Sequence, residues 1–251
     1  MASNLREISA PPALPRAEVH VWQVPMDDTS DVRALRLLLS HEEQRRADSF
    51  HTDGLRDRFV VARGWLRRVV AWYTFESPSG IRFETGEFGK PRLTSQSTGA
   101  AVEFNLSHSG DLALIAVARD AAVGIDIEEW DPAINHLELA EQFFSASECD
   151  ALRVTNPAEL TAGFFTIWTR KEAYLKATGH GITRRLRHFD VSLGLGGPTR
   201  LLLADRMDPN ATEKWAMADL TTAPSYSAAI VVETPLRGVR RFDLADYKGQ
   251  A

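Results

Sequence analysis

The order of helix and strand signals repeats in the two halves of the chain, and this repetition restricts the possible folds more than any other feature. Each half contains a capping box, a serine followed three residues later by a glutamate, and the boxes begin at Ser40 and Ser145. A longer helix follows each box, over residues 55–73 and 160–178, and short strands come after it. The pattern predicts an α+β fold with two similar lobes in one chain, and a coincidental likeness of the halves is the alternative.

The strand signals define the extent of the two lobes. Strands are expected at residues 19–24, 81–83, 104–106, 112–118, 123–128, 189–195, 201–203, 215–220 and 228–233. We therefore expect a flexible lead-in at residues 1–18, an N-terminal lobe at residues 19–120 and a C-terminal lobe at residues 121–251.

The composition is that of a globular protein and disfavours several classes of function. The 251 residues are 44% hydrophobic with a net charge of −5, so the whole chain is no polyanion binder, although 29 Lys and Arg allow a local basic patch. We expect no nucleic-acid binding, because the aromatic residues lie mostly on helix core faces instead of alternating with basic residues. The single cysteine, Cys149, cannot form an internal disulfide and is expected to pack as a small residue. Without an apolar stretch of about 20 residues or an export signal, we expect a cytoplasmic protein with no membrane partner.

A predicted strand at residues 123–128 carries two carboxylates. Side chains alternate along a strand, so its hydrophobic residues share one face and Gly124, Asp126 and Glu128 share the other. Two carboxylates this close repel each other, and a divalent cation between them removes the conflict. Oxygen ligands without His or Cys favour Mg²⁺ or Mn²⁺, and we expect Gly124 to leave room beside the pair. A solvated sheet edge with two surface acids is the alternative.

The predicted helix at residues 160–178 supplies a third carboxylate. Its helical period predicts a mostly apolar face made of Phe164, Ile167, Trp168, Lys171, Tyr174 and Leu175. The opposite, solvated side is expected to consist of Thr166, Thr169, Arg170 and Ala173. Glu172 and Lys176 lie at the border, where the acid can complete a metal site and the lysine can meet a phosphate oxygen. A simple helical ion pair is the alternative.

Several segments could contact phosphate groups. The turn at residues 107–110, Ser-His-Ser-Gly, offers hydroxyls, an imidazole and backbone donors, but it could also be an ordinary polar hairpin turn. Lys90 lies on a stiff Gly-Lys-Pro turn and could be a plain surface lysine. Arginines crowd the first two helices, and one or two of them at a cleft could bind a terminal phosphate while the rest are solvated. They are Arg45, Arg46, Arg56, Arg58 and Arg63.

Taken together, these segments resemble a known family. The motifs are Gly-Lys-Pro at 89–91, Phe-Asn-Leu-Ser-His-Ser-Gly at 104–110, Val-Gly-Ile-Asp-Ile-Glu at 123–128, Phe-Phe-Ser-x-x-Glu at 143–148 and Trp-x-x-Lys-Glu-Ala-x-x-Lys at 168–176. In that order they resemble the motif set of the 4′-phosphopantetheinyl transferases of the surfactin-synthetase-activating type. The resemblance is strong over residues 89–176, looser over 40–75 and 180–235, and absent at both ends.

The resemblance implies a fold and a set of site residues. It implies a pseudo-dimer of two similar α+β lobes, with the active site at the lobe interface, and a monomeric protein. By position, Asp126, Glu128 and Glu172 resemble the magnesium ligands, and Lys176 resembles the lysine near the phosphates. The residues that resemble coenzyme A contacts are Lys90, Ser107, His108, Arg46 and, more weakly, Arg58. One departure is Glu43, which stands where some relatives have a second basic residue and leaves the set of phosphate contacts open.

The resemblance also implies a reaction. Such an enzyme transfers the 4′-phosphopantetheine moiety of coenzyme A to a serine of an apo acyl or peptidyl carrier protein and releases 3′,5′-ADP. Glu172 is expected to take the serine proton, directly or through water, and Lys176 to offset charge on the leaving group. Lys90, Arg46 and His108 are expected to position the nucleotide. The pathway served would be the biosynthesis of fatty acids, polyketides or non-ribosomal peptides.

Two other functions remain as alternatives. The same three carboxylates and a lysine could serve a magnesium-dependent phosphodiesterase or nuclease, in which water is the nucleophile and coenzyme A or a related nucleotide is cleaved. A non-catalytic carrier-binding protein on the same scaffold is the other alternative, which the presence of all three acids and Lys176 disfavours.

Overall fold

Contacts within the chain divide it into two compact units. The computed structural model describes residues 11–29, 31–86, 90–94, 101–179, 186–193, 202–220 and 222–244, with only the backbone of residues 85 and 202–204. Unit 1 comprises Met1–Glu84, Pro91–Asp120 and Gly238–Ala251, and unit 2 comprises Thr85–Lys90 and Ala121–Arg237. In the described part of the chain, no helix is long and apolar enough to cross a membrane.

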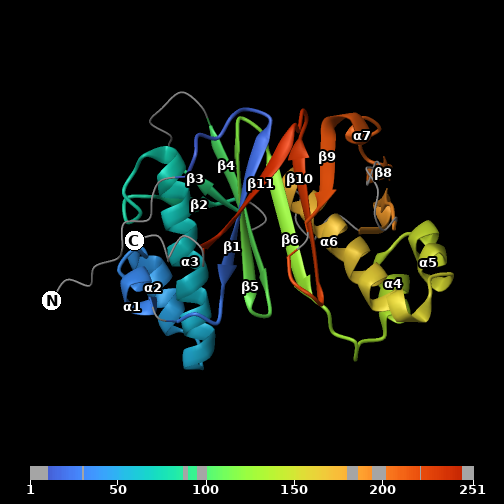
Figure 1. Ribbon diagram of the computed structural model, residues 1–251, viewed down its shortest axis with the longest axis horizontal. Coiled ribbons are helices and arrows are strands. Elements are labelled where there is room, and N and C mark those ends of the chain that lie inside the picture. The colour runs from blue at the N-terminus through green and yellow to red at the C-terminus, as the bar shows by residue number, and fades with distance from the viewer. Residues whose placement is uncertain are drawn as a thin grey trace. The chain divides into compact units, whose positions relative to one another are not determined.

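Unit 1 consists of one sheet, a small hairpin and three helices (Figure 1). In chain order its elements are β1 (Glu18–Pro25), α1 (Val32–Arg36), α2 (His41–Asp48), α3 (Asp53–Thr74), β2 (Phe83–Thr85), β3 (Pro91–Leu93), β4 (Val102–Ser109), β5 (Leu112–Arg119) and β11 (Gly238–Asp243). The order in the sheet is β11-β1-β5-β4, with β11 parallel to β1 and the other neighbours antiparallel. The end of the chain therefore completes the sheet that its first strand begins.

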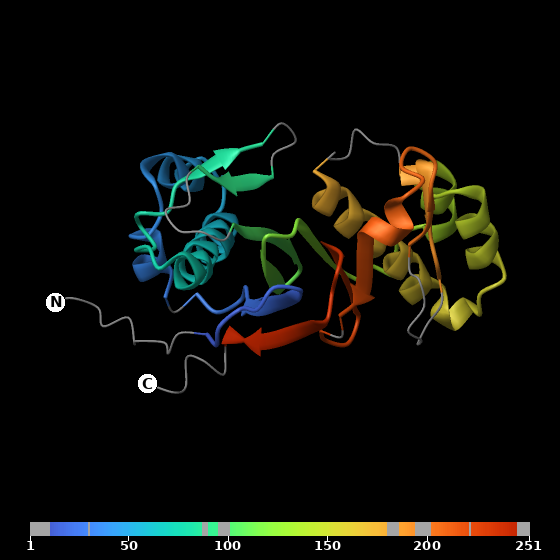
Figure 2. The same cartoon turned by 90° about the horizontal axis from the view of Figure 1, so that it is seen from above.

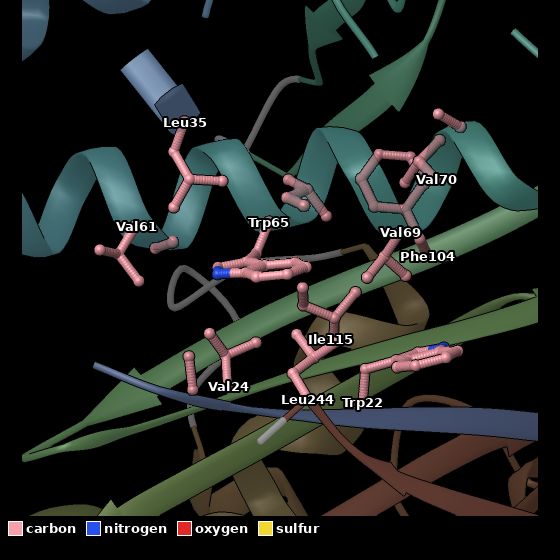
Figure 3. Packing of buried hydrophobic residues seen from close by; sticks show 14 of the residues in the cluster. Trp22, Val24, Leu35, Val61, Trp65, Val69, Val70, Phe104, Ile115 and Leu244 are labelled. Atoms are coloured by element: carbon pink, nitrogen blue, oxygen red, sulfur yellow. The ribbon is translucent and has the colours of Figure 1, made fainter. Parts of the chain in front are cut away.

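The core of unit 1 lies between α3 and this sheet. In Figure 3, Trp65 and Val69 point from α3 toward the sheet, where they meet Trp22 and Ile115. Leu35 of α1 contacts α3 from the other side, and all of these side chains are buried. The long helix can bury so much surface because its apolar residues recur at helical spacing.

Unit 2 repeats this plan. Its elements are β6 (Val123–Glu129), α4 (His136–Phe143), α5 (Ala146–Arg153), the 3-10 turn η1 (Pro157–Glu159), α6 (Leu160–Thr178), the 3-10 turn η2 (Leu186–His188), β7 (Phe189–Val191), β8 (Leu202–Asp205), α7 (Ala211–Lys214), β9 (Trp215–Asp219) and β10 (Tyr226–Glu233). The sheet order is β6-β10-β9, and both pairings are antiparallel. The order β1-β5-β4 in unit 1 is equivalent, because in both units the strand that comes last of the three in the chain lies between the other two. In Figure 2 the helices of each unit lie on one face of its sheet. The predicted α+β fold with two similar lobes is confirmed.

Both predicted capping boxes are present, and the glutamate of each box also forms an ion pair with the long helix of its unit. Glu43 accepts from the Ser40 amide at 2.9 Å, and its other partners are guanidinium groups of α3, including Arg67 at 2.7 Å. Glu148 caps α5 in the same way and binds the buried ammonium of Lys171 on α6 at 2.8 Å. In both units the short helix is thus tied to the long helix by an ion pair with its capping glutamate, which supports a true repeat.

The division of the chain differs from the expected lobes in two segments. Residues 238–251 belong to unit 1 instead of the C-terminal lobe, because β11 pairs with β1 and Leu244 enters the unit 1 core. Residues 85–90, from the last residue of β2 to the residue before β3, belong to unit 2. The short helices α1, α4 and α7 and the strands β3 and β11 were not expected, since short segments carry little periodic signal.

The expected solvated side of α6 is wrong. Thr169, Arg170 and Ala173 are buried, because β6 and β10 cover that side of the helix. Arg170 tolerates burial through its ion pair with Asp219, whose Oδ1 lies 2.8 Å from Nε. Helical periodicity failed here because α6 is enclosed on nearly all sides, so that polar residues with partners take core positions.

Candidate active site

The acidic strand and the long helix of unit 2 lie in direct contact. An added Cβ at Gly124 would lie 2.2 Å from the carbonyl oxygen of Ala173 and 2.3 Å from the amide nitrogen of Ala177. Only glycine permits this approach of β6 to α6. The expectation that Gly124 leaves room beside the acids is therefore wrong. The room is taken by the backbone of α6 at Ala173 and Ala177, the residues that directly follow Glu172 and Lys176.

Asp126 is a buried carboxylate with a cationic partner. It is the second residue after Gly124 and lies on the same face of β6, toward α6. The ammonium Nζ of Lys176 donates to its Oδ1 at 2.6 Å. The Asp126 side chain is 3% exposed and that of Lys176 is 29% exposed, so the lysine reaches from the partly solvated border of α6 to a carboxylate inside. This position excludes the surface-acid alternative for Asp126.

Glu172 lies one helical turn before Lys176, and the charges of Lys176 and of the two acids on β6 affect its pKa. Burial, together with the negative charges of Asp126 and Glu128, raises the pKa of Glu172 to about 7, although the positive charge of Lys176 opposes the increase. The carboxylates of β6 and α6 are thus close enough to repel each other. The convergence of the acid pair from the strand with a third acid from the helix on one metal ion stays a prediction.

The donor set fits a hard divalent cation in its chemistry. All three groups are carboxylates, and the mutual repulsion at Glu172 is the kind of conflict that a divalent cation relieves. Among the residues that the structure describes, however, no three His, Cys, Asp or Glu side chains are gathered closely enough to hold a metal ion. Asp126 instead binds Lys176, and Glu128 is half-buried farther along β6.

Lys90 belongs to the same unit and holds its backbone together. Its Nζ donates to the carbonyl of Val123 at 2.8 Å and to the carbonyl of Lys176 at 3.1 Å. It therefore links the start of β6 to the last turn of α6, where a cation is also favoured by the helix dipole. Gly89, the preceding residue of the predicted turn, lies outside the described residues.

Unit 1 contains the other predicted site residues. Ser107 and His108 are near the end of β4, opposite Leu114 and Ala113 of β5. The Ser107 side chain is buried and His108 is exposed. The strand thus presents only one of the two neighbouring side chains to solvent, as its alternation requires.

Arg58 of α3 is joined to the turn that follows these residues. Its guanidinium group donates to the carbonyl of Gly110 and to the carboxylate of Asp111. Gly110 has a positive φ of 52°, which glycine adopts without strain. Asp111 is a site neighbour that sequence analysis missed, and its place directly after the turn glycine was the available signal.

Arg46 is exposed at the end of α2. Its guanidinium carbon lies 5.4 Å from the ring centroid of Phe59, the residue after Arg58 on α3. The aromatic face attracts the guanidinium group, and Arg46 remains exposed to solvent. Glu43, three residues earlier, points inward to Arg63 and Arg67, so it has a structural role in this unit.

Comparisons with known families cover nearly the whole described chain. Residues 122–231 match the profile of the 4′-phosphopantetheinyl transferase superfamily. Residues 22–120 match the profile described as 4′-phosphopantetheinyl transferase, N-terminal. The two matches meet near the boundary between unit 1 and unit 2 at residues 120 and 121.

Similar proteins with curated names are also 4′-phosphopantetheinyl transferases. The chain is 35% identical over 216 residues to the 4′-phosphopantetheinyl transferase HetI of Nostoc sp., which covers 86% of this chain and 87% of that protein. It is 34% identical to the 4′-phosphopantetheinyl transferase psf-1 of Bacillus pumilus, over 84% of this chain and 87% of that protein. With the transferase Sfp of Bacillus subtilis the identity is 29%, over 78% and 83% of the two chains.

Proposed function

This chain belongs to the 4′-phosphopantetheinyl transferase superfamily, and from that premise we propose how it acts. It transfers the 4′-phosphopantetheine moiety of coenzyme A to a serine of an apo acyl or peptidyl carrier protein and releases 3′,5′-ADP. The observation that carries this proposal is the meeting of Asp126, Glu172 and Lys176 across the contact between β6 and α6. No observation favours the phosphodiesterase alternative.

Asp126, Glu128 and Glu172 are proposed to hold the metal ion, Mg²⁺ or Mn²⁺. When bound, the ion would offset negative charge on the diphosphate of coenzyme A. The chain contributes rigidity, because Asp126 is fixed on a strand that Gly124 presses against α6. The backbones that carry the ligands are thus held in place, and side chains have to rearrange for the three carboxylates to meet at one ion.

Glu172 and Lys176 are proposed to act on the transferred group. The carboxylate of Glu172 is proposed to accept the proton of the attacking serine hydroxyl, directly or through water. The ammonium of Lys176 is proposed to donate to phosphate oxygens of coenzyme A and to offset charge on the departing 3′,5′-ADP.

Residues of both units are proposed to contact the remainder of coenzyme A. Arg46 and Arg58 carry the positive charge that a 3′-phosphate needs, and Ser107 and His108 offer a hydroxyl and an imidazole. Lys90 is proposed as a further contact, in addition to its bonds to two backbone carbonyls. We further propose that the protein is monomeric and cytoplasmic, and the expectation that its active site lies at the lobe interface stays a prediction.

The test is loading of an apo carrier protein, followed by mass spectrometry, with coenzyme A and Mg²⁺ present. Asp126→Ala should abolish loading, because Asp126 is both a proposed metal ligand and the partner of Lys176. Glu129→Ala, an exposed acid on the same strand, is the matched control and should load normally. Loading by Asp126→Ala at the wild-type rate contradicts the assignment, and release of free phosphopantetheine by the wild type would indicate hydrolysis instead.

A further inference from the structure

The ion pair between Lys176 and Asp126 bears on how a metal ion enters the site. The ammonium lies 2.6 Å from Oδ1 of a carboxylate that is 3% exposed. A carboxylate taken out of water needs a cationic partner or hydrogen bonds. Lys176 thus already supplies Asp126 with the positive charge that a metal ion would supply in the proposed function, on which the following inference rests.

We propose that Lys176 is a built-in counter-ion that competes with the divalent cation for Asp126, so that coenzyme A and the metal ion strengthen each other's binding. The diphosphate of coenzyme A offers the ammonium another anionic partner. Once the ammonium turns to the diphosphate, Asp126 becomes available to the metal ion.

The competition follows from distance and charge. A magnesium ion binds a carboxylate oxygen at about 2.1 Å, and an ammonium on the same carboxylate would then lie about 4 Å from it. A divalent and a monovalent cation repel strongly at that separation when both are shielded from solvent. The two cations therefore do not share Asp126 without a loss of affinity for the metal ion.

The structure also indicates which group moves. The backbone of Asp126 is fixed in β6, where its partner in β10 is Ala229 and where Gly124 contacts α6. The backbone of Lys176 is fixed through its carbonyl, which accepts from Lys90. The Lys176 side chain, in contrast, is long and 29% exposed. A change of its rotamers alone can transfer the ammonium from the carboxylate to a phosphate oxygen, with no movement of the helix.

The inference is tested by Mn²⁺ titration of the free protein, followed by electron paramagnetic resonance of unbound Mn²⁺, with and without saturating coenzyme A. Binding of Mn²⁺ to coenzyme A alone is subtracted. Lys176→Met removes the charge and keeps most of the length, and it should bind Mn²⁺ at least about tenfold more tightly than the wild type without coenzyme A. The enhancement by coenzyme A should shrink correspondingly, since coupling between two ligands is reciprocal.

Matched variants separate the possible results. Lys176→Arg keeps the charge and should retain the weak Mn²⁺ binding and the enhancement of the wild type. Equal or weaker Mn²⁺ binding by Lys176→Met, in a protein with wild-type circular dichroism, overturns the inference and leaves the proposed metal site standing. If Asp126→Asn binds Mn²⁺ as well as the wild type does with coenzyme A present, the proposed metal site itself fails and the inference falls with it.

Discussion

His20 is a buried histidine in the first strand of unit 1. Its Nδ1 lies 2.8 Å from the Tyr73 hydroxyl, and among the described residues its Nε2 has no hydrogen-bond partner. The Glu18 carboxylate lies 3.8 Å from that nitrogen. Burial, together with the positive charge of Arg240 on β11, lowers the pKa of His20 to about 4. The folded protein therefore holds this imidazole in its neutral form.

Because the pKa of His20 is lowered in the folded state, we expect the protein to lose stability in mild acid. Between pH 6.5 and 4, His20 is mostly protonated in the unfolded chain and mostly neutral in the folded chain. The free energy of unfolding therefore falls as the pH falls through this range. From pH 7.5 to pH 5, the wild type should lose about 2 kcal/mol more than His20→Gln, as measured by urea unfolding at each pH. Parallel losses in the two proteins would show that His20 accepts its proton in the folded state.

At the scale of elements, the contact between β6 and α6 decides the geometry of the site. Gly124 is the residue of closest approach, and Asp126 is two residues farther along the strand. Since Glu172 and Lys176 directly precede Ala173 and Ala177, the two residues that Gly124 approaches, the separation of strand and helix sets the distance between the acids and the lysine. A single Cβ at Gly124 would change all of these distances together.

We therefore expect Gly124→Ala to lower the rate of carrier loading by at least about tenfold and to destabilise the protein by roughly 1–3 kcal/mol, the usual cost of overpacking. Loading is measured by mass spectrometry and stability by urea unfolding. Gly238→Ala is the matched control, because an added Cβ there has no neighbour within 4 Å in a strand of unit 1. If both variants behave alike, the close approach at Gly124 has no role in the site.

At the scale of the whole molecule, the chain carries the same plan twice but places the acids in only one copy. Near the end of α6, Lys176 reaches Asp126 on β6. Near the end of α3, in contrast, the Tyr73 hydroxyl accepts from the Trp22 indole of β1 at 2.9 Å and lies beside His20. The equivalent strand–helix contact of unit 1 thus holds a buried aromatic cluster, which stabilises the unit.

Unit 1 also depends on β11, the last strand in the part of the chain that the structure describes. A chain that ends at Arg237 lacks β11 and Leu244, so the amides of β1 that donate to β11 should exchange with deuterium much faster. Those of β6 and β10 should keep their protection, because unit 2 contains its whole sheet. Hydrogen exchange with mass spectrometry measures the protection of both sets of amides, and a chain that ends at Leu244 serves as the control. Equal protection of β1 in the two chains would contradict the prediction.

Sequence analysis predicted the elements with strong local signals. The capping serines Ser40 and Ser145, the long helix that ends before Gly179, and the alternation along residues 123–128 all act over a few neighbouring residues. Sequence analysis therefore identified Asp126, Glu172 and Lys176 as a group. It failed where burial comes from distant segments, as at Arg170, whose partner is Asp219 in β9.

The sequence by itself determined the order of the long helices and the main strands, the repeat and the residue types of the site, because capping, periodicity and motif spacing are local properties. Only the tertiary structure decided that β11 completes the first sheet, that Gly124 brings α6 onto β6, and that Lys176 binds Asp126. The physical reason is the same in each case. These contacts join residues far apart in the chain, and their distances depend on how whole elements pack.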